Sequence, residues 1–259
     1  MTGGDMSIRE DICDGVATVV MDNPPVNALN IGDAYEVARL LGCYRENLEV
    51  RAVVLTAEGH GFCAGVDIVE MQELPGHAGI VEANRSCAEA FRAVYECAVP
   101  VIAAVNGHCL GSGIGLVGSA DVVVAAEGAT FGLPEVDNGA LGAATHLMRL
   151  VPVQRARWML YSCERATAEE LHSYGSVLRV VADDQLAAEA RELASVIAEK
   201  DPTVIRAAKA SLNAIEPVEM ADSYRLEQGY TFELNLLGLG DRARDAFLRG
   251  ERDQALTAD

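Results

Sequence analysis

Two glycine-rich stretches constrain this chain more than any other feature. They read GHGFCAGVDI over residues 59–68 and NGHCLGSG over residues 106–113, and each follows an apolar run. Glycine lets a backbone approach a ligand closely, and a helix that begins just after such a turn leaves its first N–H groups unpaired. The sequence therefore predicts two strand-to-helix turns whose backbone amides face outward.

Two such turns could bind one oxygen atom between them. If they converge, two fixed N–H donors would stabilise negative charge on a carbonyl oxygen, which is an oxyanion hole. The alternative is a pair of ordinary loops, because glycine occurs in turns of every fold. The residues within the turns leave both interpretations open.

Charge and cysteine usage exclude several classes of function. The formal net charge is −19, and Lys200 and Lys209 are the two lysines, so no basic stripe is available for nucleic acid. The seven cysteines lack the spacing of zinc ligands, which favours reduced thiols and predicts no metal site. No apolar run reaches the ~18 residues of a signal anchor or membrane helix, so we expect a cytoplasmic protein without a membrane partner.

The apolar pattern predicts an α/β fold. Residues 7–13 and 16–21 flank Asp14-Gly15 as a β-hairpin, and a helix is expected from Asn30 to about Asn47. Strands at residues 50–56, 100–105 and 122–124 then alternate with helices. From residue 141 onward the pattern is mainly helical, with a capping box at Thr167 and Glu170.

Four ordered blocks resemble the crotonase superfamily, the family of enoyl-CoA hydratases and isomerases. They are NPPVNALN at residues 23–30, GFCAGVDI at 61–68, PVIAAVNG at 100–107 and FGLPE at 131–135. The resemblance implies a spiral of ββα units followed by a helical C-terminal oligomerisation region. It further implies an acyl-CoA thioester as the substrate, with no cofactor beyond this coenzyme A.

The resemblance also implies roles for individual positions. The oxyanion donors would be the backbone N–H groups of Val66 and Ser112, and Glu135 would be the catalytic carboxylate. Hydratases of this family place a second glutamate on the helix of the second turn, and that position is Gly115 here. One carboxylate can remove and return a proton, so double-bond isomerisation is favoured slightly over hydration.

Other ionisable groups lie near these positions in the sequence. Asp137, His108 and His146 could each supply a second acid or activate water, although a surface or core role is the more frequent one for a single such residue. Asp67 is expected to cap the helix after the first turn. The thiols of Cys63 and Cys109, which lie within the turns, are expected to be small packing groups.

For coenzyme A, the resemblance points to the backbone around two short stretches as the walls of the binding groove. These are Asn27, Ala28 and Leu29 in the first block, and Ala64, Asp67 and Ile68 in the second. Residues 1–200 would form the crotonase core, and residues 201–259 a helical region that assembles a homotrimer or a dimer of trimers. An intramolecular helix that folds back on the core is the alternative for the apolar segment 223–239.

Three functions remain open from the sequence. The first is an enoyl-CoA isomerase or hydratase that works through an oxyanion-stabilised enolate. The second is a hydrolase of a ring or carbon–carbon bond, or a decarboxylase, on the same scaffold, with Asp137 or His146 as an added group. The third is a protein that binds acyl-CoA without catalysis, which the missing glutamate suggests.

Overall fold

The larger of two sheets has six strands in the order β1-β2-β3-β5-β7-β10. The computed structural model describes residues 7–75, 78–138 and 140–216. Strands β1 and β2 form the predicted antiparallel hairpin, and every later pairing in this sheet is parallel. The strands of this sheet are β1 Ile8–Cys13, β2 Val16–Met21, β3 Ala52–Ala57, β5 Val101–Val105, β7 Val122–Ala126 and β10 Arg179–Val181.

A second sheet of four short strands has the order β4-β6-β8-β9. Its strands are β4 Gly61–Cys63, β6 His108–Leu110, β8 Thr130–Gly132 and β9 Ala166–Thr167. The sequence interpretation treated these stretches as turns or left them unassigned, which was wrong. Each strand spans only two or three residues and is formed by pairing with distant segments, so no local periodicity marks it.

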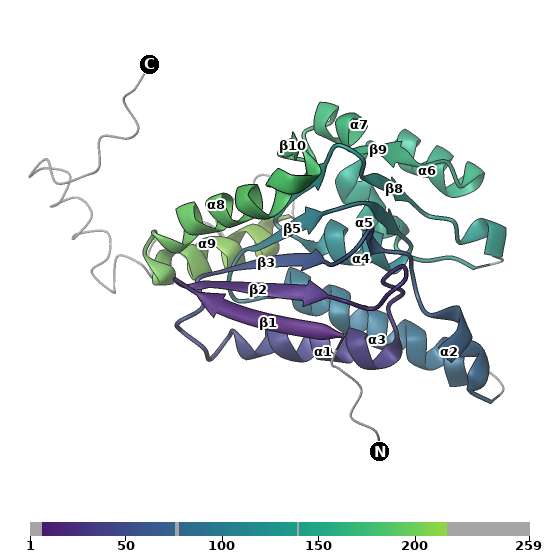
Figure 1. Ribbon diagram of the computed structural model, residues 1–259, viewed down its shortest axis with the longest axis horizontal. Coiled ribbons are helices and arrows are strands. Elements are labelled where there is room, and N and C mark those ends of the chain that lie inside the picture. The colour runs from purple at the N-terminus through teal and green to yellow at the C-terminus, as the bar shows by residue number, and fades with distance from the viewer. Residues whose placement is uncertain (1–6, 76–77, 139, 217–259) are drawn as a thin grey trace, which may run out of the picture. The chain divides into compact units, whose positions relative to one another are not determined.

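Helices follow β2, β4, β6, β8, β9 and β10 along the chain and cover the sheets (Figure 1). The helices of the part that ends at Pro202 are α1 Ile31–Cys43, α2 Ile68–Glu73, α3 Ala78–Tyr95, α4 Ser112–Ser119, α5 Ala144–Leu150, α6 Val153–Ser162, α7 Ala168–Ser173 and α8 Leu186–Ala198, with 3-10 turns at Val136–Asn138 and Asp183–Gln185. Asn30 caps α1 and Thr167 caps α7, as predicted. Helix α1 ends at Cys43, four residues before the predicted end, because residues 44–47 turn back on Gly42 and Cys43.

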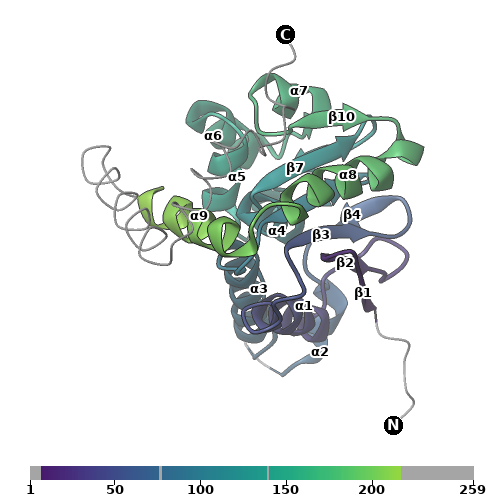
Figure 2. The ribbon, with the colours of Figure 1, turned by 90° about the vertical axis from the view of Figure 1, so that its left-hand side faces the viewer.

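Both faces of the larger sheet are buried. Along β3, Val53 and Leu55 face a core with α1, α3 and α4, whereas Ala52 and Val54 face a smaller core with α8. Figure 2 shows α8 and the helices α1 and α3 on opposite sides of this sheet. A strand that is buried on both faces has a continuous apolar run as its sequence pattern, which is why β3 was recognisable in the sequence.

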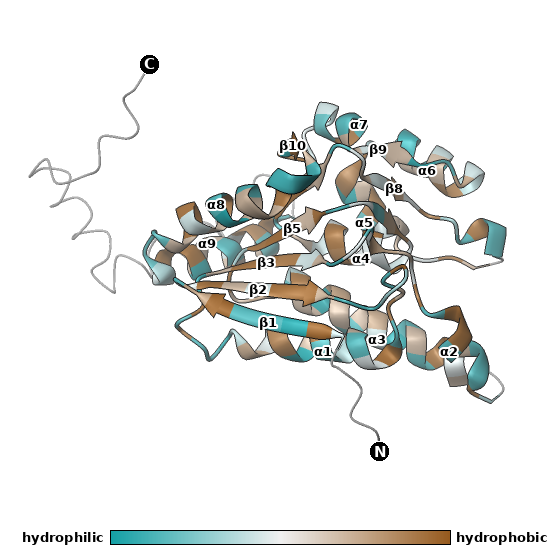
Figure 3. Cartoon of the chain, in the orientation of Figure 1, coloured by the Kyte–Doolittle hydropathy of each residue, from teal (hydrophilic) through white to brown (hydrophobic). Residues whose placement is uncertain are grey.

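The edge strand β1 differs from the inner strands. Its residues Arg9–Asp11 are exposed and hydrophilic, in contrast to the apolar strands beside it (Figure 3). Charged side chains on an edge strand discourage pairing with other chains.

Contacts between Cα atoms divide the chain into two units. The first ends at Pro202 and the second begins at Thr203, so most of helix α9 (Pro202–Ile215) belongs to the second. The apolar segment 223–239 lies outside the described residues.

Candidate active site

The segment that precedes α1 pairs with the first glycine turn through backbone hydrogen bonds. Leu29 pairs with this turn through its own N–H, which donates to the carbonyl of Gly65 at 2.8 Å, and through its carbonyl, which accepts from Asp67 at 3.1 Å. These two partners flank Val66, so the amide of Val66 points to the other side of the turn. Its N–H makes no hydrogen bond with any described residue.

The second glycine turn ends at the N-terminus of α4. Gly111 has φ 55° and ψ −114°, a conformation that favours glycine, and no side chain caps the helix there. The first intrahelical bond at this end runs from the N–H of Gly115 to the carbonyl of Gly111. The N–H of Ser112, the first helical residue, therefore has no partner inside the helix.

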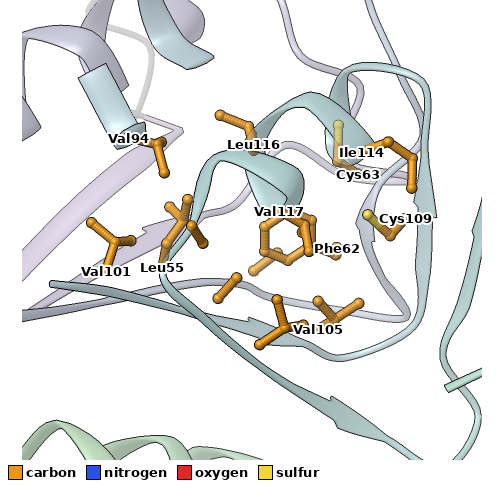
Figure 4. Packing of buried hydrophobic residues seen from close by; sticks show 14 of the residues in the cluster. Leu55, Phe62, Cys63, Val94, Val101, Val105, Cys109, Ile114, Leu116 and Val117 are labelled. Atoms are coloured by element: carbon orange, nitrogen blue, oxygen red, sulfur yellow. The ribbon is translucent and has the colours of Figure 1, made fainter. Parts of the chain in front are cut away.

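The two turns touch each other. A methyl group built on Gly111 would lie 3.2 Å from the Cα of Gly65. Strands β4 and β6 bring Cys63 and Cys109 into register, and the Cys63 thiol accepts from the Gly65 N–H at 3.4 Å and lies 3.5 Å from the Ser112 hydroxyl. Both thiols are buried beside α4 (Figure 4). The predicted packing role of the two cysteines is thus consistent with the structure, and Cys63 contacts both turns.

Glu135 lies at the place where the two turns meet. It follows β8, and its Oε1 would be 2.8 Å from a methyl group on Gly111. The other carboxylate oxygen, Oε2, is buried and has no hydrogen-bond partner among the described residues. Burial raises the pKa of Glu135 above its ordinary value, because the charged form loses its hydration. The carboxyl group is therefore suited to accept and return protons closer to neutral pH.

A phenylalanine ring covers Gly115, the position at which the resemblance implies a second glutamate in hydratases. A methyl group built on Gly115 would lie 2.2 Å from Cζ of Phe91. No larger side chain fits at this position unless that ring moves. No residue pattern connects Phe91 with Gly115, because the two residues lie on different helices and share no motif.

The three additional ionisable candidates lie in different surroundings. The ring of His108 covers Gly61, and its Nε2 lies 3.2 Å from the carbonyl oxygen of Val26. Asp137 is exposed in a 3-10 turn. The ring of His146 on α5 packs edge-on against Phe91, with centroids 5.0 Å apart. Of the three, His146 is the one in contact with a side chain that lies against α4.

The six residues predicted to line the coenzyme A groove are brought together by the Leu29 bridge, but two of their side chains have structural roles. The amide of Asn27 is buried and donates to the carbonyls of Glu58 at 2.7 Å and Gly61 at 2.6 Å. The carboxylate of Asp67 caps α2, as predicted, by accepting from the N–H groups of residues 69 and 70. Ala28 and Ala64 are half-buried beside them, and Ile68 is exposed.

The described residues contain no group of three or more histidine, cysteine or acidic side chains placed to hold a metal ion. Across the same part of the chain, no helix is both long and apolar enough to span a bilayer.

Comparison with known proteins agrees with this geometry. Residues 11–235 match the sequence profile of the enoyl-CoA hydratase/isomerase family. The chain belongs to this family. The predicted resemblance and the α/β crotonase fold are therefore confirmed, and the protein is an enzyme of the crotonase family that processes a CoA thioester.

The relatives differ in the reactions that their names describe. A (7aS)-7a-methyl-1,5-dioxo-2,3,5,6,7,7a-hexahydro-1H-indene-carboxyl-CoA hydrolase from Rhodococcus jostii is 55% identical over 235 residues, 91% of each chain. A hydrolase of the same name from Mycobacterium tuberculosis is 54% identical and covers 91% of this chain and 95% of its own length. The mevalonyl-coenzyme A hydratase of Aspergillus fumigatus is 36% identical, covering 79% of this chain and 77% of its own.

Solved structures match the fold closely. The human enoyl coenzyme A hydratase domain-containing protein 3 has a TM-score of 0.90 at 27% identity and covers 96% of this chain and 99% of its own. An enoyl-CoA hydratase from Mycobacterium smegmatis has a TM-score of 0.89 at 28% identity, with the same coverage. The predicted preference for isomerisation finds no support among these relatives and stays a prediction.

Proposed function

We propose that this enzyme hydrolyses a carbon–carbon bond in the ring of an alicyclic keto acyl-CoA. The backbone N–H groups of Val66 and Ser112 would hold the thioester oxygen, and Glu135 would move the proton. The observation that carries the proposal is the position of the Glu135 carboxylate at the meeting point of the two glycine turns, together with the Phe91 ring over Gly115. The site thus offers one carboxylate and an apolar wall.

One carboxylate is sufficient for a ring-opening hydrolysis. Ionised Glu135 would take a proton from water while the hydroxide adds to the ring ketone. The tetrahedral adduct then collapses, the bond between the former ketone carbon and its ring neighbour breaks, and the electron pair moves into conjugation with the thioester. The protonated glutamic acid returns its proton to the carbanion carbon, and the products are a new carboxylic acid and a C–H bond. Water is the single co-reactant.

The charge that develops on the thioester oxygen explains the need for the two glycine turns. Loss of one oxyanion donor costs about 2.7–4 kcal/mol of transition-state stabilisation in an enzyme where this was measured. Burial of Glu135 favours the same reaction, since a carboxylate with a raised pKa is a stronger base toward water and holds the proton until the carbanion takes it. No step requires a second carboxylate at residue 115.

The names of two relatives support the proposed substrate class. Each describes a hydrolase of a fused bicyclic diketone that is linked to coenzyme A, and each aligns with about nine tenths of this chain at more than half identity. Fold alone would not support this choice, because the family uses one scaffold for several reactions. Double-bond isomerisation is the second candidate, since it also needs one carboxylate.

Proton and thiol release separate these reactions. Ring opening liberates one proton per turnover and leaves the thioester intact, whereas thioester hydrolysis also releases a thiol; hydration and isomerisation release neither. With the bicyclic diketone CoA ester as the substrate, we expect proton release without thiol, and a product 18 mass units heavier, since one water is added. Crotonyl-CoA and 3-hexenoyl-CoA serve as hydratase and isomerase substrates. Turnover of either ester with no proton release from the diketone would contradict the proposal.

Coenzyme A binding, the extent of the catalytic core and the assembly of the chain are further parts of the proposal. We propose that coenzyme A binds along Asn27, Ala28, Leu29, Ala64, Asp67 and Ile68 without a further cofactor. We also propose that residues 1–200 form the catalytic core and that residues 201–259 assemble the chain as a homotrimer or a dimer of trimers in the cytoplasm. Light scattering of the full chain measures the assembly, and a monomer at micromolar concentration would exclude it.

A further inference from the structure

Three glycines form one stripe along α4. Gly111, Gly115 and Gly118 are four and three residues apart, so they lie on the same side of the helix. Seven residues of helix rise about 10 Å, which is the distance along the axis from the first glycine to the last. A different residue lies against each glycine of the stripe.

The close approach at each glycine can be measured. A methyl group built on Gly111 would lie 2.8 Å from Oε1 of Glu135, and one on Gly118 would lie 2.7 Å from Cβ of His146. Between them, the ring of Phe91 covers Gly115. The order along α4 is therefore the Glu135 carboxylate, the Phe91 ring, and the main chain and Cβ of His146, whose imidazole packs edge-on against Phe91.

Two side chains of this row have polar atoms without partners in the described part of the chain. Oε2 of Glu135 and Nδ1 of His146 are buried and make no hydrogen bond within the described residues. A buried polar group without a partner costs free energy, so such atoms require an external partner or a function. Phe91 between them is half-buried and packs on the main core.

Other charged groups around the imidazole are engaged elsewhere. Arg149, one turn further along α5, donates to the carbonyl of Gly118, and its guanidinium lies 5.2 Å from the ring centre of Tyr95. Burial, with a smaller contribution from Arg149, lowers the pKa of His146, so the ring is neutral near pH 7. A neutral imidazole still has one N–H to donate.

We propose that Phe91 and His146 select the acyl group. An alicyclic ring packs on the exposed part of Phe91, and His146 donates a hydrogen bond to a ketone oxygen on the side of that ring away from the thioester. The inference rests on the proposed function in one respect, which is that the thioester oxygen lies at Val66 and Ser112. It adds the chemical class that the far end of the site recognises.

Binding of three CoA esters to the full-length protein tests this inference. The probes are hexanoyl-CoA, cyclohexanecarbonyl-CoA and 4-oxocyclohexanecarbonyl-CoA, and calorimetry gives each Kd. The wild type is expected to bind the oxo ester about five- to tenfold more tightly than the plain ring, as one net hydrogen bond allows. It is also expected to prefer the plain ring to the linear chain.

Matched variants assign the two preferences. His146→Phe keeps a ring beside Phe91 but removes both nitrogens, and it is expected to abolish the preference for the oxo ester while leaving the affinity for cyclohexanecarbonyl-CoA unchanged. His146→Asn keeps a donor near the position of Nδ1 and is expected to restore part of the preference. Phe91→Leu is expected to weaken binding of both cyclic esters relative to hexanoyl-CoA by about fourfold. Circular dichroism confirms that each variant is folded.

The outcomes separate this inference from the proposed function. Equal binding of the two cyclic esters by the wild type, or an unchanged preference in His146→Phe, would overturn the inference even if ring opening is observed. If His146→Phe loses the preference but the wild type releases no proton from the diketone ester, the selectivity stands and the hydrolysis fails. Absence of binding to all three esters would overturn both.

Discussion

Replacing Gly111 by alanine would separate the two glycine turns from each other and from Glu135. The added methyl group would lie 3.2 Å from the Cα of Gly65 and 2.8 Å from the Glu135 carboxylate. The carboxylate is the end of a flexible side chain and can move, whereas the backbone of Gly65 is fixed by its hydrogen bond to Leu29. Gly111 also has a positive φ, which an alanine adopts only under strain.

The size of the effect follows from two contributions. The strained backbone costs about 1–3 kcal/mol, and crowding at a packed site costs about 1–3 kcal/mol more, so the free energy of unfolding is expected to fall by roughly 2–6 kcal/mol. Displacement of catalytic groups by about 1 Å can lower activity about 100-fold. We therefore expect Gly111→Ala to reduce kcat/KM by about that factor in the fraction that remains folded.

The assay needs a control for the strain alone. Gly175 has a φ of 82° with no atom within 4 Å of an added methyl group, and it lies in the turn after α7. Gly175→Ala should lose stability in urea unfolding but keep wild-type kcat/KM. Wild-type activity of Gly111→Ala, or an equal loss of activity in Gly175→Ala, would refute the proposed convergence of the turns on the reacting group.

Three further predictions concern other residues of the site. Glu135→Gln is expected to lower kcat about 100- to 10,000-fold while CoA-ester binding persists. Because burial raises the pKa of Glu135, the apparent pKa of the acidic limb of the wild-type kcat/KM profile should lie above the ordinary glutamate value of about 4.3. Burial destabilises the ionised carboxylate of Glu135, so the folded protein loses stability as the pH rises through the raised pKa of this group. Glu135→Gln removes the charge and should therefore raise the melting temperature at pH 7 more than at pH 4. Asn27→Ala is expected to cost about 2–4 kcal/mol in urea unfolding, because it leaves the carbonyls of Glu58 and Gly61 without their donor at a position with positive φ; wild-type stability would exclude the bridging role. Asp67→Ala is expected to cost about 1 kcal/mol by the same measurement, and no loss would show that the cap of α2 is dispensable.

The elements with a local signal were predictable from the sequence. The hairpin around Asp14-Gly15 and the caps at Asn30 and Thr167 agree with the structure, because turn and cap residues act on their immediate neighbours. The capping box was half right: Thr167 accepts from the N–H of Glu170, but the Glu170 carboxylate binds Arg155. That ion pair joins separate elements, and sequence spacing gives no sign of it.

The boundaries of two helices, α3 and α5, were predicted less well. The apolar pattern predicts a helix over residues 80–98, whereas α3 runs over Ala78–Tyr95, so it begins two residues earlier and ends three residues earlier. Helix α5 begins at Ala144, three residues after its predicted start, because Ala143 adopts a left-handed conformation before it. Such a turn depends on packing around Glu135 and α4, and no residue pattern indicates it.

The site was predictable in its backbone and less so in its side chains. The two glycine turns and the Pro-Glu pair, with the family resemblance, predicted a site at which Gly65, Gly111 and Glu135 do lie close together, while the catalytic roles of Val66, Ser112 and Glu135 stay predictions. The contact of Phe91 with Gly115, and that of His146 with Phe91, depend on how α3 and α5 pack against α4. Gly115, at the position where the resemblance implies a glutamate in hydratases, was the one available signal, since a glycine there leaves space for another side chain.

The proposed catalysis requires two amides that bind the same oxygen, and a crystal structure with an uncleaved acyl-CoA bound tests this most directly. The two distances from the thioester oxygen to the backbone nitrogens of Val66 and Ser112 decide it. Both are expected to be about 2.7–3.1 Å, the range of an oxyanion hole. A thioester oxygen that contacts only one of these nitrogens, or neither, would contradict the account.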